Sequence, residues 1–361
     1  MAISLSNIRK SFGEHRAVDG VTVDVDDGEF FVVLGPSGCG KSTLLRLIAG
    51  LERPDGGEIS LGGRKVCGAG HHVPPQARDV GVVFQSYALW PHMSVRENVS
   101  FPIESLGTKR AAALTAADTH LATVALSDFA ARRPADLSGG QRQRVALARC
   151  LAQGASTILM DEPLANLDPH LRASMEEEIA AFHRRAGATT LYITHDQREA
   201  MALATRVAVM ARGRLQQVAT PQDLHDRPAT AEVARFIGRS TVLSARLSDA
   251  GQVDIGGRPV PAETDGRTTP GAVSVVVRPG DVHLGDGPLS GRVFRVFYRG
   301  GTWEGSVEVA GLDEALPVSS ARPLRDGEAV PLAITRAWVL PRASETPGYD
   351  TGRQAPAEAV E

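Results

Sequence analysis

A glycine-rich segment of eight residues constrains the fold of this chain more than any other feature. The segment fits the pattern G-x-x-x-x-G-K-[ST] and reads Gly35-Pro36-Ser37-Gly38-Cys39-Gly40-Lys41-Ser42. The apolar run 29–34 before it predicts a buried strand, and the run 42–49, followed by Gly50, predicts a helix. A chance glycine-rich turn is the alternative, but both flanks match the pattern. The segment therefore predicts an α/β P-loop fold that binds a nucleoside triphosphate.

The residue types of this segment indicate which groups of the nucleotide they contact. Glycines let backbone N–H groups turn inward and form an anion-binding nest at a helix N-terminus. Lys41 is expected to reach the β- and γ-phosphates, and the Ser42 hydroxyl is expected to bind Mg²⁺.

A second segment predicts another anion-binding helix terminus. It reads Leu137-Ser138-Gly139-Gly140-Gln141. Ser138 is a favourable N-cap residue, and apolar residues recur at helical spacing over 145–151, so a helix is predicted to begin just after Ser138. The two glycines leave the first N–H groups of that helix approachable. Taken alone, the segment is better explained as an ordinary capped helix.

Two further apolar runs end in ionisable side chains. The run 156–161 ends in Asp161 and is followed by Glu162, and the run 189–194 is followed by His195. We expect Asp161 to reach the Mg²⁺ beside Ser42, and Glu162 to orient or deprotonate the attacking water. His195 is placed to donate to the γ-phosphate from the carboxyl end of a parallel strand. The alternatives are a solvated carboxylate pair and a structural histidine.

Taken in this order, the motifs resemble the ATP-binding cassette (ABC) family of transport ATPases, over nearly the whole chain. The signature 137–141 is specific to that family among P-loop proteins. The resemblance implies that 35–42, followed by Thr43, is the Walker A segment and that 158–161 ends the Walker B strand. It also makes Glu162 the catalytic glutamate and His195 the switch histidine.

The resemblance assigns three more positions. Gln85 matches the Q-loop glutamine, which contacts the metal or the water, and residues 165–168 match the D-loop that ends in Asp168. Phe12 matches the aromatic residue that stacks on adenine, where tyrosine is frequent. Other roles compete with two of these assignments. Phe12 alone could belong to a core, and Asp168 is also a plausible N-cap for a helix that opens at Pro169.

The signature also implies a partner. In the family, two cassettes stack head to tail, and each ATP lies between the P-loop of one chain and residues matching Ser138–Gln141 of the other. This chain has one P-loop and one signature. We therefore expect a homodimer, or a heterodimer with a similar cassette.

Bulk composition limits the function classes. The formal net charge is -3, without the strong basic excess typical of nucleic-acid binders. The three cysteines, Cys39, Cys67 and Cys150, show no zinc or disulfide spacing, which favours reduced thiols. No apolar run approaches the ~20 residues that span a bilayer, and the first residues do not resemble a signal peptide. We expect a peripheral protein at the cytoplasmic face of the inner membrane, with a separate chain forming the pore.

The chain is expected to contain two domains. Residues 1–238 form the cassette, in which about 86–155 form a helical subdomain that, in the family, receives a coupling helix of the membrane subunit. Short alternating runs in 239–342 predict a small all-β barrel, which looks like the OB-like accessory domain of import ATPases. The polar tail 343–361 is expected to be disordered.

The functional expectation follows from these parts. The chain is predicted to hydrolyse ATP with Mg²⁺ and to energise a permease that imports ferric iron, a polyamine or a related small solute, delivered by a solute-binding protein. One alternative is a sugar-type importer ATPase with a regulatory C-terminal domain. The other is a soluble ABC ATPase of DNA repair or translation. Those proteins carry a long coiled coil or two cassettes, and this chain shows neither.

Overall fold

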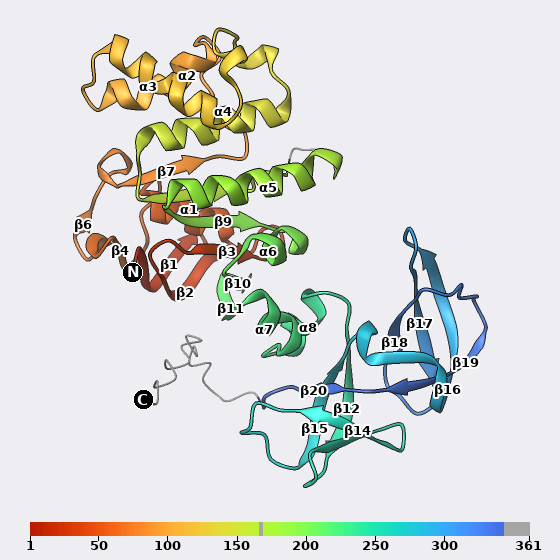
Figure 1. The fold of residues 1–361 in the computed structure, drawn as a ribbon. Helices are drawn as coiled ribbons and strands as arrows, with labels where there is room; N and C mark the ends of the chain where they lie inside the picture. Colours follow the sequence, from red (N-terminus) through yellow and green to blue (C-terminus); the bar gives the residue numbers. More distant parts are fainter. Residues whose placement is uncertain (166–168, 343–361) are drawn as a thin grey trace, which may run out of the picture. The chain divides into compact units, whose positions relative to one another are not determined.

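The computed structural model describes residues 1–165 and 169–342, and only the backbone of residues 169–171. The chain divides into two compact units, one covering residues 1–215 and the other beginning at residue 216 (Figure 1). This division precedes the predicted cassette boundary at residue 238. The domain boundaries therefore stay a prediction, and the predicted tail 343–361 lies outside the described residues.

A six-stranded sheet in the order β11-β10-β3-β9-β8-β7 positions the nucleotide motifs. Its strands are β3 Phe30–Leu34, β7 Val80–Val83, β8 Thr157–Asp161, β9 Thr189–Thr194, β10 Arg206–Ala211 and β11 Arg214–Ala219. Strands β10, β3, β9, β8 and β7 pair in parallel. Every residue of β3, β8 and β9 is buried, as expected for parallel strands covered on both faces. Their carboxyl ends consequently meet at one edge.

The other elements of the first unit surround this sheet. An antiparallel sheet in the order β2-β1-β4-β5-β6 comprises β1 Ile3–Phe12, β2 His15–Val25, β4 Gly56–Leu61, β5 Arg64–Gly68 and β6 His71–His72. Helix α1 (Lys41–Ala49) contacts strands of both sheets and ends at Gly50, whose φ of 81° is left-handed. Helices α5 (Pro169–Ala186) and α6 (Gln197–Leu203) contact each other, and α6 packs on β3 and β9.

Three helices form a separate bundle beyond β7 (Figure 1). They are α2 Val95–Ser105, α3 Arg110–Thr123 and α4 Gly139–Gln153. Their shared core includes Val99, Leu121 and Val145, each fully buried. This bundle lies within the range that the sequence assigns to the helical subdomain.

The second unit is mostly β-structure, as predicted. Its helices are α7 Pro221–Asp226 and α8 Ala231–Phe236. A closed barrel contains β12 Thr241–Leu247, β13 Gln252–Ile255, β14 Arg258–Glu263, β15 Gly271–Val277 and β20 Ala337–Val339. A four-stranded sheet contains β16 Val282–Tyr298, β17 Trp303–Val309, β18 Leu316–Ser320 and β19 Ala329–Ile334. One hydrophobic core joins the barrel and the sheet. The predicted P-loop fold class with an OB-like β domain is confirmed.

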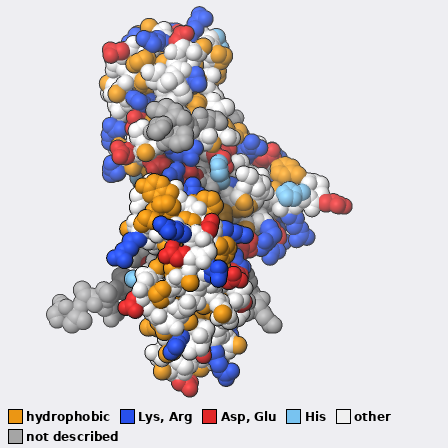
Figure 2. Space-filling model, turned by 90° about the vertical axis from the view of Figure 1, so that its right-hand side faces the viewer, with side chains coloured by type: hydrophobic (Ala, Val, Ile, Leu, Met, Phe, Trp, Pro, Cys, Tyr) orange, Lys and Arg blue, Asp and Glu red, His pale blue; other side chains and the backbone are white. Residues whose placement is uncertain are grey.

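The surface carries both charge signs. Basic and acidic side chains are interspersed over the described residues on the face drawn in Figure 2. Such a mixture gives this face no extended field of one sign. Within 1–165 and 169–342, none of the helices combines the length and the apolar character that crossing a bilayer requires.

A buried amide holds the loop that enters the helical bundle. Asn98 on α2 is fully buried. Its Oδ1 accepts from Trp90 N at 2.9 Å, and its Nδ2 donates to the carbonyls of Trp90, Met93 and Ser94 at 3.0–3.3 Å. The two Nδ2 protons are shared among these three carbonyls, and the Ser94 carbonyl also accepts from Asn98 N at 2.9 Å. The side chain therefore joins Trp90 and Met93 of the loop to the start of α2.

We predict that Asn98→Ala lowers the free energy of unfolding by about 2–4 kcal/mol, because buried backbone groups lose their partners. Urea denaturation would measure the loss. Thr115→Ala, on the exposed face of α3, is the matched control and should change stability by less than about 0.5 kcal/mol. Equal effects of the two variants would contradict the role given to Asn98.

Candidate nucleotide-binding site

The glycine-rich loop passes so close to other backbone that two of its glycines have no room for a side chain. A Cβ at Gly40 would lie 2.0 Å from the Ala17 carbonyl oxygen, and one at Gly35 would lie 2.2 Å from that of Met210. Gly40 also has a φ of 108°, a region that favours glycine. The glycines therefore permit packing of the loop as well as approach to phosphate.

The loop encloses the ammonium group of Lys41. This side chain is buried, and Nζ donates to the carbonyl oxygens of Gly35 at 2.8 Å and Pro36 at 3.1 Å. Nζ also lies 3.7 Å from Glu162 Oε1. A fixed positive charge thus lies inside the loop, beside the carboxylate predicted to be catalytic.

Ser42 and Asp161 meet at the start of α1. Ser42 Oγ donates to Asp161 Oδ1 at 2.8 Å. Burial raises the pKa of Asp161, and the hydrogen bond from Ser42 opposes that shift. In the described ranges, no three His, Cys, Asp or Glu side chains cluster as a metal site. A hydroxyl and one carboxylate fit Mg²⁺, which usually takes one or two protein oxygens together with phosphates and water.

Glu162 and His195 lie side by side at the same edge. His195 Nδ1 is 2.9 Å from Glu162 Oε2. The backbone of Glu162 has a φ of 44°, uncommon for a residue other than glycine, and its N–H donates to Ile193 O on β9 at 3.0 Å. This anchored turn after β8 directs the carboxylate toward both Lys41 and His195. The structure thus unites Lys41, Ser42, Asp161, Glu162 and His195.

The roles of three further predicted residues, Phe12, Gln85 and Asp168, are not tested by the structure. Phe12 is 49% exposed at the end of β1, with Lys10 Nζ 5.2 Å above its ring. Gln85 is exposed and follows β7, which pairs in parallel with β8, so it leaves the sheet at the same edge as Asp161. Asp168 lies outside the described residues. Stacking on adenine, the Q-loop contact and the D-loop role stay predictions.

The signature forms a helix start, as predicted. Helix α4 begins at Gly139 with Ser138 as its N-cap. Ser138 Oγ accepts from Gln141 N at 3.3 Å, and Gln141 Oε1 accepts from Ser138 N at 2.9 Å. This reciprocal capping box holds the turn while the N–H groups of Gly139 and Gly140 still point out of the helix. Binding of nucleotide by the four residues stays a prediction.

Sequence reasoning missed Arg149, which joins α4 to the chain after Gln85. The Arg149 guanidinium donates to the carbonyls of Tyr87 at 2.9 Å and Ala88 at 2.7 Å, and its carbon lies 5.0 Å from the centre of the Trp90 ring. Tyr87 and Ala88 both have positive φ angles. An arginine within the apolar helical stretch 145–151 was the only signal in the sequence.

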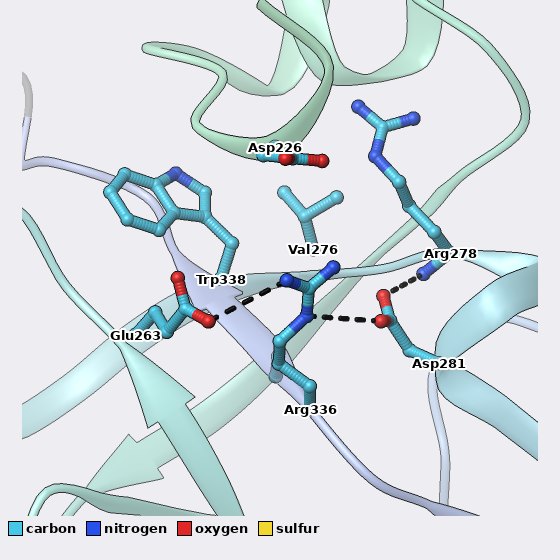
Figure 3. A pocket seen from close by; sticks show the side chains of 8 residues that line it. Asp226, Glu263, Val276, Arg278, Asp281, Arg336 and Trp338 are labelled. Atoms are coloured by element: carbon cyan, nitrogen blue, oxygen red, sulfur yellow. Dashed lines mark hydrogen bonds and ion pairs between the residues drawn. The ribbon is translucent and has the colours of Figure 1, made fainter. Parts of the chain in front are cut away.

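A second polar site lies within the β-rich unit (Figure 3). Arg336 lies between Asp281, 3.2 Å from its Nε, and Glu263, 3.5 Å from its Nη1. Asp281 also accepts from the backbone N–H of Arg278 at 3.1 Å. The side chain of Arg278 donates to Ile237 O at 2.7 Å. These ion pairs and hydrogen bonds tie the Pro279–Asp281 turn to the barrel, a structural role.

Comparisons with known proteins agree with this geometry. The family described as ABC transporter matches residues 18–165. The spermidine/putrescine import ATP-binding protein PotA of Methylococcus capsulatus is 41% identical over 95% of this chain and 93% of its own length. The chain belongs to the ABC transporter family. The sn-glycerol-3-phosphate import ATP-binding protein UgpC of Burkholderia pseudomallei is 48% identical over 69% of each chain.

Two solved structures agree with the fold described above. A dimeric ATP-binding cassette in a post-hydrolysis state, bound to ADP and Pi, superposes with a TM-score of 0.53 and 29% identity, over 61% of this chain and 98% of its own. CbiO1 of Clostridium perfringens shares the fold, with a TM-score of 0.56 over 62% of this chain and 90% of its own. The predicted family and the ATPase activity are confirmed, and binding of ATP is supported.

We predict that Asp161→Asn raises the thermal stability of the nucleotide-free chain at neutral pH, while ATP turnover falls by roughly 100-fold as a metal ligand weakens. Because the folded-state pKa of Asp161 is raised, the folded protein is destabilised as pH rises from the ordinary value of 3.8 through the raised pKa. Asparagine keeps the acceptor for Ser42 without the buried charge.

The thermal gain should therefore shrink as pH falls toward 3.8. Calorimetry at several pH values, beside steady-state kinetics, measures both effects. A lower melting temperature for Asp161→Asn at neutral pH would contradict the account of the buried carboxylate.

Proposed function

We propose that this chain is the ATP-hydrolysing subunit of an importer, acting as a dimer beneath a membrane permease. The observation that carries this is the cluster of Lys41, Glu162 and His195 beside the Ser42–Asp161 pair. It places a cation, two carboxylates and an imidazole at the mouth of a phosphate-binding loop. The import function is supported by the relatives, whose names describe import ATP-binding proteins.

The residues divide the work of hydrolysis. Lys41 and the loop N–H groups bind the β- and γ-phosphates of ATP, and Phe12 stacks on the adenine. Ser42 and Asp161, with Gln85, hold Mg²⁺, which supplies neutralisation of phosphate charge when bound. Thr43, next along α1, continues the phosphate-binding turn.

Glu162 serves as the base that orients and deprotonates water. A carboxylate only accepts hydrogen bonds, so the 2.9 Å contact requires a proton on His195 Nδ1. In the proposed site His195 contacts both Glu162 and the γ-phosphate. The histidine thus aligns the base with the phosphate that the water attacks.

The site of one chain is incomplete, because the signature supplies a second phosphate-binding terminus. In the proposed assembly, Ser138–Gln141 of one copy close over the ATP held by the P-loop of the other, and the family resemblance assigns Asp168 to nucleotide binding as well. The dimeric state of the ADP-bound relative supports this arrangement. A homodimer is the simplest form, and a heterodimer with a similar cassette is the alternative.

The remaining partners are proposed from the family. The permease binds the helical bundle, where the Trp90 ring packs against the Phe101 ring at 4.5 Å between ring centres and a tilt of 53°. The chain then lies at the cytoplasmic face of the inner membrane, and a solute-binding protein delivers the cargo. The relative that covers 95% of the chain is named for spermidine and putrescine, which favours a polyamine, with ferric iron or a sugar-type solute as alternatives.

Glu162→Gln should abolish nearly all turnover, by roughly 100- to 10,000-fold, because glutamine cannot take a proton from water. ATP binding should persist, since Lys41 and the loop are unchanged, and the variant should dimerise when ATP is added. Steady-state kinetics, ATP titration and light scattering test the three statements. Wild-type turnover, or a monomer with and without ATP, contradicts the proposal.

The permease is tested with the same variant. A pull-down of tagged Glu162→Gln with ATP, from gently solubilised source membranes, should recover a polytopic membrane protein, whose own partners indicate the cargo. Lys41→Ala, which weakens phosphate binding, is the control and should recover less. Recovery of only DNA-repair or ribosomal factors would favour the soluble ABC ATPase instead.

A further inference from the structure

We propose that Glu199, a buried carboxylate on α6, is a positioning residue that holds the turn carrying His195 through the hydroxyl of Thr194. The inference rests on the proposed role of His195. Glu199 belongs to none of the motifs that predicted the site, and its side chain does not touch His195 in any described contact.

Two hydroxyl groups from β9 converge on one oxygen of this carboxylate. Thr194 Oγ1 donates to Glu199 Oε2 at 2.6 Å, and Tyr192 Oη donates to the same oxygen at 2.8 Å. All three side chains are at most 3% exposed. Burial raises the pKa of Glu199, and the hydrogen bonds from Thr194 and Tyr192 oppose that shift. A carboxyl group is costly to bury, and these bonds offset part of the cost.

The bond from Thr194 sets the direction of the next one. A threonine hydroxyl has one proton and two lone pairs, so donation to Glu199 leaves the oxygen free to accept. Thr194 Oγ1 accepts from the backbone N–H of Asp196 at 2.9 Å. Thr194 and Asp196 flank His195 on either side. The carboxylate therefore orients the one hydroxyl that closes the histidine turn.

Asp196 is held from its other side as well. Its Oδ1 accepts from Arg198 N at 2.8 Å and caps α6, and its Oδ2 accepts from Arg172 Nη1 at 3.0 Å. Arg172 Nε lies 3.9 Å from Glu199 Oε1. The residues flanking His195 are thus anchored within the protein. The imidazole itself, with its side chain 51% exposed, keeps Nδ1 2.9 Å from Glu162.

The competing explanation is that Glu199 has a purely structural role. The hydroxyls of Tyr192 and Thr194 allow the two explanations to be tested separately. Tyr192 and Thr194 donate to the same buried oxygen, but only Thr194 also accepts from the turn. Removing the Tyr192 hydroxyl therefore disturbs Glu199 without releasing Asp196. Tyr192→Phe and Thr194→Val form a matched pair.

The experiment measures kcat and KM for ATP in the full chain, with thermal unfolding of each variant. We expect Glu199→Ala and Thr194→Val to lower kcat by roughly 10- to 100-fold, because small misplacement of a catalytic group has effects of that size. KM should change little, since neither residue lies at the phosphate loop. Tyr192→Phe should keep the kcat of the unmodified chain. Glu199→Gln retains an acceptor oxygen, so it should keep most of the kcat that Glu199→Ala loses.

Combination with His195→Ala tests whether the effect passes through the histidine. Glu199→Ala should cause no further loss of kcat in that background, because residues that act as a unit are not additive. If His195→Ala alone keeps normal turnover, the proposed role of His195 fails.

If His195→Ala loses turnover but Glu199→Ala and Thr194→Val keep it, only the positioning role is overturned. Equal losses of kcat in Tyr192→Phe and Thr194→Val would also overturn it. Should Glu199→Ala fail to fold, that near-isosteric pair decides the question.

Discussion

The parallel pairing of β9 with β3 on one side and β8 on the other determines where every proposed catalytic group lies. In this register Leu34 is opposite Thr194, and Asp161 is opposite Ile193. The P-loop, the two carboxylates and the histidine therefore leave the sheet at one edge, within one or two residues of their strands. A shift of one residue would turn each side chain to the other face of the sheet. The strands are fully buried, which strongly specifies this register.

At this edge of the sheet, two carboxylates lie close together and one of them is buried, which disfavours their charged forms. Asp161 is buried, and Glu162 adds a second negative charge beside it, which also raises the pKa of Asp161. Lys41 lies 3.7 Å from Glu162 and offsets part of that repulsion. In the proposed function, a bound divalent cation offsets the remaining repulsion between the two carboxylates. The same burial of charge explains why Asp161→Asn should stabilise the chain and also lower ATP turnover.

The histidine turn shows how a surface group is fixed from the interior. In its proposed role His195 needs exposure to meet a nucleotide, and an exposed side chain has little packing to hold it. The buried Glu199–Thr194–Asp196 chain of hydrogen bonds supplies rigidity without covering the imidazole. Arg149 has a comparable role near Gln85, where its guanidinium donates to the carbonyls of Tyr87 and Ala88, two residues with positive φ. In both places a charged group with several hydrogen bonds organises a turn that packing alone leaves loose.

The sequence by itself determined the P-loop fold, the strands before Lys41, Glu162 and His195, and the helix that starts after Ser138. These features are local, since a glycine pattern, an apolar run or an N-cap is readable from neighbouring residues. The OB-like β domain was also predictable, although its division into a barrel and a four-stranded sheet was not. Phe12 and Gln85 rest on the family resemblance, because no local pattern distinguishes them.

Only the tertiary structure decided the contacts between distant segments. The carbonyls of Ala17 and Met210 exclude side chains at Gly40 and Gly35, although the sequence explains these glycines by phosphate binding alone. Glu199 stands four residues after His195 and looks like an ordinary helical carboxylate until α6 packs against β9. Its role depends on which hydroxyl groups face it, and strand register and helix packing set that arrangement. Such interactions join side chains through space, and one sequence carries no record of those distances.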